Sequence, residues 1–447
     1  MPYSYLTFAQ ARAEAAKRLE DTGNIHFADA ELGIYLLEAM REWQSWSGYW
    51  RDRGTFRLSS NTAFYDLTAL LTDGAGQLML APTVTDTQMV TEILYHLLEP
   101  PAIPYAGTTQ FTLDGITQAL QRRRDQFLVE TGAVVTELLL NVPSAPIGRV
   151  PLPDNVIDVR RAAWNTALAS LGSYPVWLSD EFAANAFSPR WNLSPGTVQT
   201  YSILGPPPLT IQLLPPPTAS GALDILMVGS GAALNPTAGV PLGIPDNLSW
   251  VVKWGALADL LSQDGEARDD FRAGYCEARW QEGIELARLM PVILLAALEE
   301  QPVFPQSVAE LDAFRSSWCV TAGPPDSLAT AGLNLLAAAN IPDGGSYSVR
   351  LDVVRNAVTP VNDGDYIQVG REFLDVLLDE SVHLAKFKDG GSDLENSVPM
   401  HQRFIRAAGI VSDRLRASTL YLRACGEQSS REKSLRPRRE SDAEVAV

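Results

Sequence analysis

Histidine and cysteine suggest metal or nucleophile chemistry most directly, and both are scarce in this chain. The four histidines include no pair three or four positions apart, so the helical His pairs that bind zinc are missing. Cys276, Cys319 and Cys425 stand far apart and form no C-x-x-C pair. We therefore expect buried free thiols instead of a zinc site or a disulfide framework. His96, in the run Tyr95-His96-Leu97-Leu98, is expected to be a core or capping histidine.

Sequence signatures of catalysis and nucleotide binding are also missing. The sequence contains no G-x-S-x-G, no P-loop and no G-x-G-x-x-G after a strand. Gly229-Ser230-Gly231 could cradle a phosphate only before a helix, and Asn235-Pro236 opposes one. The carboxylate pairs Asp180-Glu181 and Asp269-Asp270 are expected at helix starts, where they favour the positive end of the helix dipole. The sequence thus predicts no catalytic residue, no cofactor-binding residue and no metal ligand.

Contacts with other subunits are the one class of site for which the sequence offers candidates. Trp43, Trp46 and Trp50 cluster near the end of a predicted helix, and tryptophan is common both in cores and at interface hot spots. Both interpretations stay open for them. The basic run Arg122-Arg123-Arg124 is interpreted as a solvated helix face or a subunit contact. A phosphate patch is the weaker alternative in so acidic a chain.

Helical periodicity dominates both ends of the chain. Thr7-Phe8-Ala9-Gln10 and Thr85-Asp86-Thr87-Gln88 are capping boxes that open helices, and Asp29 is the expected N-cap of a helix to Trp43. Further helices are predicted at Phe111–Glu130, Leu248–Leu261, Ala267–Leu289, Arg371–Lys388 and Met400–Leu420. For the helix Ala267–Leu289 we expect a solvent face made of Arg272, Glu277, Arg279, Glu282, Glu285 and Arg288.

Between residues 133 and 229 the apolar residues alternate as in strands. Strands are predicted at Ala133–Val142, Val156–Trp164, Pro175–Leu178, Val198–Leu204, Leu209–Leu214 and Ala222–Val228. The predicted fold class is α+β, with helical hairpins and bundle elements combined with an antiparallel β-sandwich or barrel module. The expected modules are a mainly helical N-terminal module at residues 1–131, a β-rich module at 132–244, helical hairpins with short strands at 245–425, and a polar C-terminal arm at 426–447.

The formal net charge of −18 limits the partners of the chain. Proteins that grip duplex DNA neutralise phosphates with Lys and Arg, so this balance opposes DNA binding as the main task. It also opposes adhesion to anionic membranes. An acidic wall would instead let DNA slide past. The sequence has no signal-peptide pattern and no apolar run of about 20 residues, so we expect folding in a cytosol and no membrane partner.

Three stretches, about a quarter of the chain, resemble proteins of tailed-phage particles. Leu6–Trp43 resembles the opening of head–tail adaptor and connector proteins, through Leu19-Glu20-Asp21, Phe27, Asp29-Ala30-Glu31-Leu32 and Leu36–Glu42. Ile244–Leu289 resembles a recurrent helical hairpin of phage virion proteins, through Trp254–Leu261 and Gly265–Arg268. Phe373–Ala407 resembles another such hairpin, through His383-Leu384-Ala385, Lys386-Phe387-Lys388 and Gly390-Gly391. Many neck adaptors are much shorter than this chain, which leaves room for a larger neck or nozzle component.

This resemblance implies a structural virion protein and not an enzyme. It implies a ring-forming head-to-tail adaptor or connector in the phage neck, which joins portal to tail and lets DNA pass through an acidic channel. The ring would be a homo-oligomer, commonly of twelve copies in the resembled class and assembled in the host cytoplasm, with the portal protein, a tail or nozzle protein and fibre proteins as candidate partners.

Other functions are weighed beside it. A tail nozzle or fibre-docking platform is the alternative. A tail-associated glycan hydrolase is a lower one, which needs two carboxylates roughly 5 to 9 Å apart across an aromatic-lined cleft.

The C-terminal arm supplies the remaining candidate contacts with a neighbouring subunit or the portal. These are the basic residues Arg431, Lys433, Arg436, Arg438 and Arg439. The arm has almost no apolar residues and cannot order itself by burial. We expect it either to dock on an acidic groove of the neighbouring ring or to remain a solvated tail.

Overall fold

The structure of the chain is a computed structural model, which describes residues 5–98, 110–144, 148–165, 173–187, 194–205 and 208–435, with side chains of the last helix as far as Arg414. About 41% of the chain is helix and 24% is strand, and one sheet is nearly closed into a barrel, so the predicted α+β class is confirmed.

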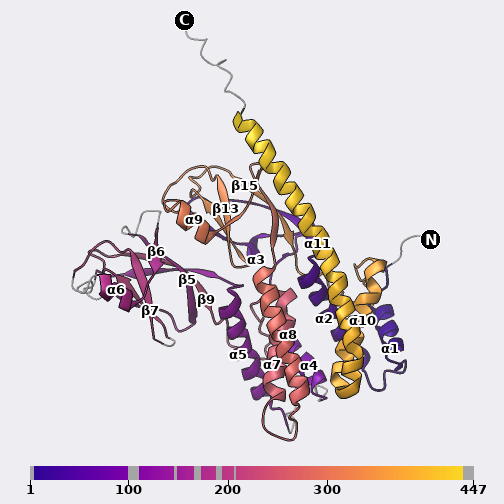
Figure 1. Ribbon diagram of the computed structural model, residues 1–447. Helices are drawn as coiled ribbons and strands as arrows, with labels where there is room; N and C mark the ends of the chain where they lie inside the picture. Colours follow the sequence, from indigo (N-terminus) through magenta and orange to yellow (C-terminus); the bar gives the residue numbers. More distant parts are fainter. Residues whose placement is uncertain are drawn as a thin grey trace.

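The long helices pack together into one helical body (Figure 1). They are α1 (Phe8–Arg18), α2 (Asp29–Ser47), α4 (Asp86–His96), α5 (Leu113–Thr131), α7 (Ser249–Leu261), α8 (Asp270–Leu289), α10 (Arg371–Asp389) and α11 (Gly391–Leu435). Their shared core joins residues from both ends of the chain, including the fully buried Trp43, Trp254 and Phe404. Both predicted capping boxes, at the starts of α1 and α4, are confirmed. None of the described helices combines the length and the apolar character that crossing a bilayer requires.

Three local predictions about the helices are wrong. Ala28 is the N-cap of α2, because it is still extended whereas Asp29 is already helical. The last helix begins at Gly391 and not at Met400, and it continues to Leu435, inside the predicted arm. Pro399 removes one backbone hydrogen bond without ending this helix, because the flanking turns are packed on the body. The expected solvent face of α8 is wrong at Arg272 and Arg279, which are buried, whereas Glu285 and Arg288 are exposed as predicted.

A seven-stranded sheet forms the β module, and each of the six predicted strands is present in it. Its order is β3-β9-β5-β6-β7-β8-β4, antiparallel except for the pair β6–β7. The strands are β3 (Thr136–Val142), β4 (Arg149–Pro151), β5 (Val156–Asn165), β6 (Tyr174–Leu178), β7 (Thr200–Leu204), β8 (Thr210–Leu214) and β9 (Gly221–Gly229), and α6 (Glu181–Phe187) follows β6. Alternate residues such as Val159, Leu223 and Ile225 fill the interior of the sheet.

Two four-stranded sheets join the beginning of the chain to its later residues. One has the order β1-β15-β10-β11 and the other β12-β13-β14-β2. Their elements are β1 (Arg51–Arg57), β2 (Phe64–Asp66), β10 (Ile293–Leu298), β11 (Gln301–Val303), β12 (Gln306–Ser307), β13 (Ser327–Ala331), β14 (Leu335–Ala339) and β15 (Ser348–Val354), with the short helices α3 (Leu67–Leu70) and α9 (Val308–Phe314). The expected modules 1–131 and 245–425 therefore share sheets as well as a core, and their exact boundaries remain a prediction.

Candidate functional site

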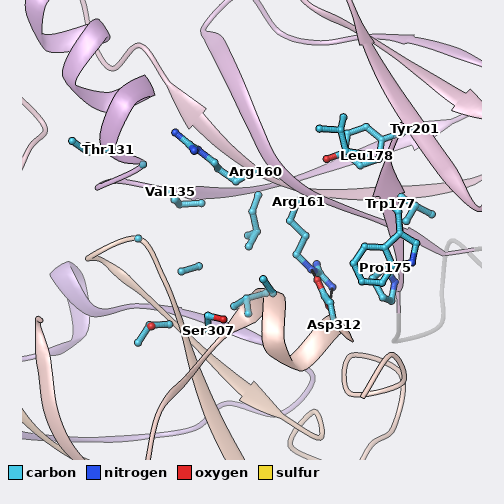
Figure 2. A pocket seen from close by; sticks show the side chains of 18 residues that line it. Thr131, Val135, Arg160, Arg161, Pro175, Trp177, Leu178, Tyr201, Ser307 and Asp312 are labelled. Atoms are coloured by element: carbon cyan, nitrogen blue, oxygen red, sulfur yellow. Dashed lines mark hydrogen bonds and ion pairs between the residues drawn. The ribbon is translucent and has the colours of Figure 1, made fainter. Parts of the chain in front are cut away.

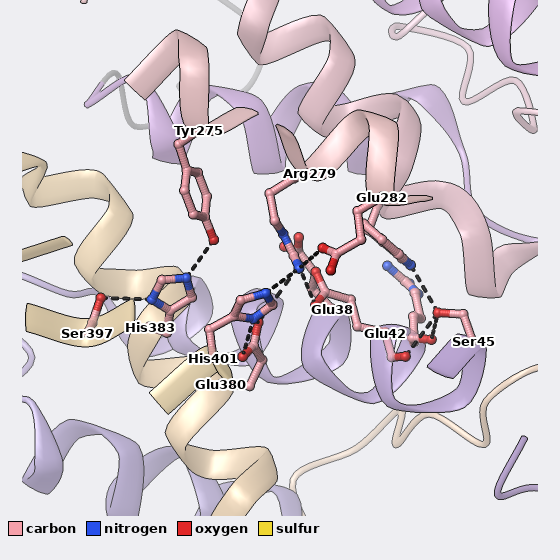
Figure 3. Close-up of polar contacts among 12 residues, drawn as sticks. Glu38, Glu42, Ser45, Tyr275, Arg279, Glu282, Glu380, His383, Ser397 and His401 are labelled. Carbon is pink, nitrogen blue, oxygen red and sulfur yellow. Dashed lines mark hydrogen bonds and ion pairs between the residues drawn. The ribbon is translucent and has the colours of Figure 1, made fainter. Parts of the chain in front are cut away.

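The centre of the helical body contains a group of polar and charged side chains where apolar packing would be expected (Figure 3). We call it the buried polar cluster, and it consists of Glu38, Glu42, Glu92, His96, Lys253, Tyr275, Arg279, Glu380, His383, Ser397 and His401. Glu38 and Glu42 lie four residues apart on α2 and so share one helix face, toward the hairpin of α7 and α8. Charges so deep in a protein require partners, because an unpaired buried charge is costly.

Lys253, on α7, organises one half of the cluster. It is fully buried, and its Nζ contacts Glu38 and lies 3.1 Å from Nε2 of His96. An ammonium group can only donate, so Nε2 accepts and the His96 ring carries its proton on Nδ1. Burial and then Lys253 lower the pKa of His96 to about 3. Burial alone would raise the pKa of Glu38, but Lys253 lowers it to about 2.

Arg279, on α8, organises the other half. Its Nη2 donates to Glu42 at 2.6 Å, and its Nη1 donates to Nε2 of His401 at 2.7 Å. Nδ1 of His401 lies 2.9 Å from both carboxylate oxygens of Glu380. Because a guanidinium has no acceptor, Nε2 must accept and the Nδ1–H must donate to Glu380. His401 is thereby held as one neutral tautomer, and burial followed by Arg279 lowers its pKa to about 3.

A chain of hydrogen bonds beside Arg279 joins three helices. The Tyr275 hydroxyl lies 2.6 Å from Nε2 of His383, whose Nδ1 lies 2.7 Å from the Ser397 hydroxyl. Ser397 donates its single proton to the carbonyl of Leu394. The Nδ1–H of His383 must therefore donate to Ser397, and Tyr275 donates to Nε2. This chain fixes α8, α10 and α11 relative to one another.

Three residues of the cluster have a spacing that could hold a metal ion. Glu42, Glu380 and His401 offer three ligand atoms within 4.8 Å of one another. Arg279, however, is hydrogen-bonded to two of these groups and occupies the acceptor nitrogen of His401. It supplies the positive charge that a metal would bring. We therefore assign the three residues to an ion-pair network whose cation is Arg279, and not to a metal centre.

Comparison with family models and with curated proteins identified no relative of this chain.

The predicted contact residues have different positions in the structure. Trp43 is fully buried against Phe373 and Phe404, with ring centroids 5.3 and 5.6 Å away. Trp50 is also buried, and Trp46 is partly buried at the edge of the same core. Core packing is thus the correct interpretation of Trp43 and Trp50. Of the predicted basic contact residues, Arg431 and Lys433 lie in the last turns of α11, where the structure describes the backbone alone. Arg436, Arg438 and Arg439 lie outside the described residues.

The basic run at residues 122–124 pairs within the chain. Arg122 and Arg123 both bind Asp259, at 2.5 and 2.6 Å. Arg124 is fully buried, so the predicted solvated face is wrong at this position. It donates to the carbonyls of Ser230 and Ala232 because α5 packs against the turn after β9. Two other expectations are confirmed, since Cys276 and Cys319 are buried free thiols and His96 is a core histidine; the side chain of Cys425 lies outside the described residues.

A second place with polar groups is a cleft between the seven-stranded sheet and α9 (Figure 2). It measures about 390 Å³, and Trp177, Tyr201, Arg161 and Asp312 are among its lining residues. Arg161 reaches from β5 to Asp312, with bonds of 2.7 and 3.1 Å. Trp318 donates to the same carboxylate at 2.8 Å. Asp312 is the one carboxylate among the described lining residues, and these contacts use it to join two regions of the molecule.

The buried polar cluster was not predicted, although the sequence contains a signal for it. Lys253 is the one ionisable residue in the run Trp250–Ala258, and Glu380 and His383 interrupt the apolar stripe of α10. A single ionisable residue inside an apolar helix face indicates a buried partner. The partner itself cannot be identified from spacing, because it lies on another helix.

Proposed function

We propose that this chain is a ring-forming structural subunit of a tailed-phage neck, a head-to-tail adaptor or connector. The observation that carries the proposal is α11. Its early turns are seated on α2 and α10 through the buried Leu394, Phe404 and Ala408, while its later turns extend beyond the rest of the molecule (Figure 1). Its 45 residues correspond to roughly 70 Å at 1.5 Å per residue.

A helix that leaves its own body needs a neighbour. Isolated helical segments are marginal in water, and most of their stability in proteins comes from packing. A second copy in a ring would supply that packing, because head-to-tail contacts that close by rotation bring one surface of each subunit onto a different surface of the next. An assembly therefore accounts for the length of α11 better than a solitary monomer does.

Exposed apolar side chains support the same proposal. Tyr174, Trp177 and Leu178 on β6 and Phe182 on α6 are between 53% and 84% exposed, although they are large and apolar. Apolar groups that gather on a surface mark interaction sites. The net charge of −18 supports the other element of the proposal, a channel wall that repels DNA and lets it slide.

Electron microscopy of the purified chain and of phage particles tests this proposal. We expect a closed ring around an axial channel. A variant that ends at Arg414 keeps the buried polar cluster and should stay folded by circular dichroism, but it should no longer close the ring. Single copies on the particle exterior, or a ring that forms equally well without residues 415–447, would contradict the proposal.

A further inference from the structure

We infer that Glu42 and Glu380 form a buried acid pair that holds one proton, carried by Glu42, and that this proton keeps α11 seated on the helical body. The inference is independent of the proposed function. It rests on the hydrogen-bond geometry of the two carboxyl groups and on the charges that surround them.

Arg279 contacts more carboxyl groups than its single charge can neutralise. The ionisable groups that face the pair come from four helices: Glu38 and Glu42 on α2, Tyr275, Arg279 and Glu282 on α8, Glu380 and His383 on α10, and His401 on α11. Glu38 is neutralised by Lys253. Both imidazoles are neutral in the tautomers described above. Among the described residues Arg279 is then the single cation that contacts Glu42, Glu380 and the partly exposed Glu282, so one buried carboxyl group must take up a proton.

The contacts of the two carboxyl groups identify Glu42 as the one that carries the proton. Glu380 accepts the Nδ1–H of His401 on both oxygens and lies 3.8 Å from Nη2 of Arg279, which favours its anion. Glu42 uses Oε2 toward Arg279, while its Oε1 has no partner among the described residues as long as the group is ionised. A proton on Oε1 turns it into a donor, and a hydrogen bond from Glu42 to Glu380 holds the pKa of Glu380 down. Burial raises the pKa of both carboxyl groups above the ordinary value of a glutamate, so a proton held by this pair is retained near neutral pH.

Glu380 and His401 connect the proton to α11. Glu380 orients His401, and His401 is the residue of α11 that reaches Arg279. If Glu42 loses its proton, the adjacent carboxylates of Glu42 and Glu380 share the one guanidinium of Arg279 in the core. Their repulsion then weakens the packing of α11 on the helical body. The folded-state pKa of Glu42 lies above its ordinary value of about 4.5. The stabilisation of α11 by protonated Glu42 is therefore complete below about pH 4.5 and is lost as the pH rises through about 8.

Hydrogen exchange on the full chain at about pH 6.5 and about pH 9, corrected for intrinsic rates, tests the inference. In the wild type, amides of residues 394–411 should exchange roughly tenfold faster at the higher pH, relative to amides of the seven-stranded sheet. Glu42→Gln mimics the protonated acid and should abolish this pH response. Glu380→Gln replaces one of the two oxygens that accept from His401 by an NH2 group, which cannot accept, and should loosen α11 at both pH values.

Glu282→Gln is the matched control, because it changes a partly exposed carboxylate on Arg279 and should keep the wild-type pH response. If Glu380→Gln does not fold, the comparison of the wild type with Glu42→Gln still decides. A wild type whose α11 exchanges alike at both pH values, or a Glu42→Gln variant with an undiminished pH response, would overturn the inference.

Discussion

At the scale of single residues, Lys253 shows how strongly the helical body depends on paired charges. It is fully buried and is the ammonium partner of Glu38. We expect Lys253→Met to lower the free energy of unfolding by about 3 to 5 kcal/mol, since it leaves the Glu38 carboxylate unpaired in the core. Urea denaturation measures the change. The double variant Lys253→Met/Glu38→Gln should recover some of the loss, because it removes the unpaired charge.

An exposed ion pair provides the comparison for Lys253. Arg53 binds Asp352 at 2.6 Å on the sheet surface, and its side chain is 61% exposed. Arg53→Met should cost at most about 1 kcal/mol, because solvent screens exposed pairs. Equal losses for Arg53→Met and Lys253→Met would show that burial does not set the strength of these pairs.

At the scale of elements, the hairpin of α7 and α8 depends on a close approach between its helices. A Cβ atom on Gly283 of α8 would lie 2.4 Å from Cγ2 of Val251 on α7. We expect Gly283→Ala to lower the free energy of unfolding by about 1 to 3 kcal/mol through overpacking. Gly274 is on the same helix with open space around it, so Gly274→Ala should be neutral or stabilising by up to about 1 kcal/mol. Thermal unfolding of the two variants would contradict this account if both changed stability alike.

At the scale of the whole molecule, the ion pair of Arg161 and Asp312 joins the seven-stranded sheet to α9. Both side chains are less than a tenth exposed, and Asp224 adds a second buried carboxylate 3.6 Å from Arg161. Arg161→Met should therefore cost about 3 to 5 kcal/mol and expose residues 136–229 to limited proteolysis. Arg315→Met breaks the exposed pair with Asp326 just after α9 and should leave the cleavage pattern unchanged. Unchanged proteolysis in both variants would mean that apolar contacts alone hold the sheet in place.

Several features that depend on neighbours in sequence were predicted correctly, although the N-cap of α2 and the start of α11 were not. The capping boxes at Thr7 and Thr85 need only residues three positions apart, and the strands between residues 133 and 229 need only an alternating pattern. The same local rules failed for α8. They assign charged residues to solvent, but α8 packs among other helices and turns Arg279 into the core.

The sequence by itself determined the α+β class and the places of most long helices and of the strands between residues 133 and 229. It also showed that the chain is acidic and has few residues for metal or nucleophile chemistry. Only the tertiary structure decided which charges are buried and which partners they have. Arg279 meets Glu42, Glu380 and His401, which come from helices that precede it by more than two hundred residues or follow it by about a hundred. Such pairing depends on how the helices pack and not on spacing along the chain. A buried charge is stable only next to a partner, and the packing of the helices decides which residue is close enough to be that partner.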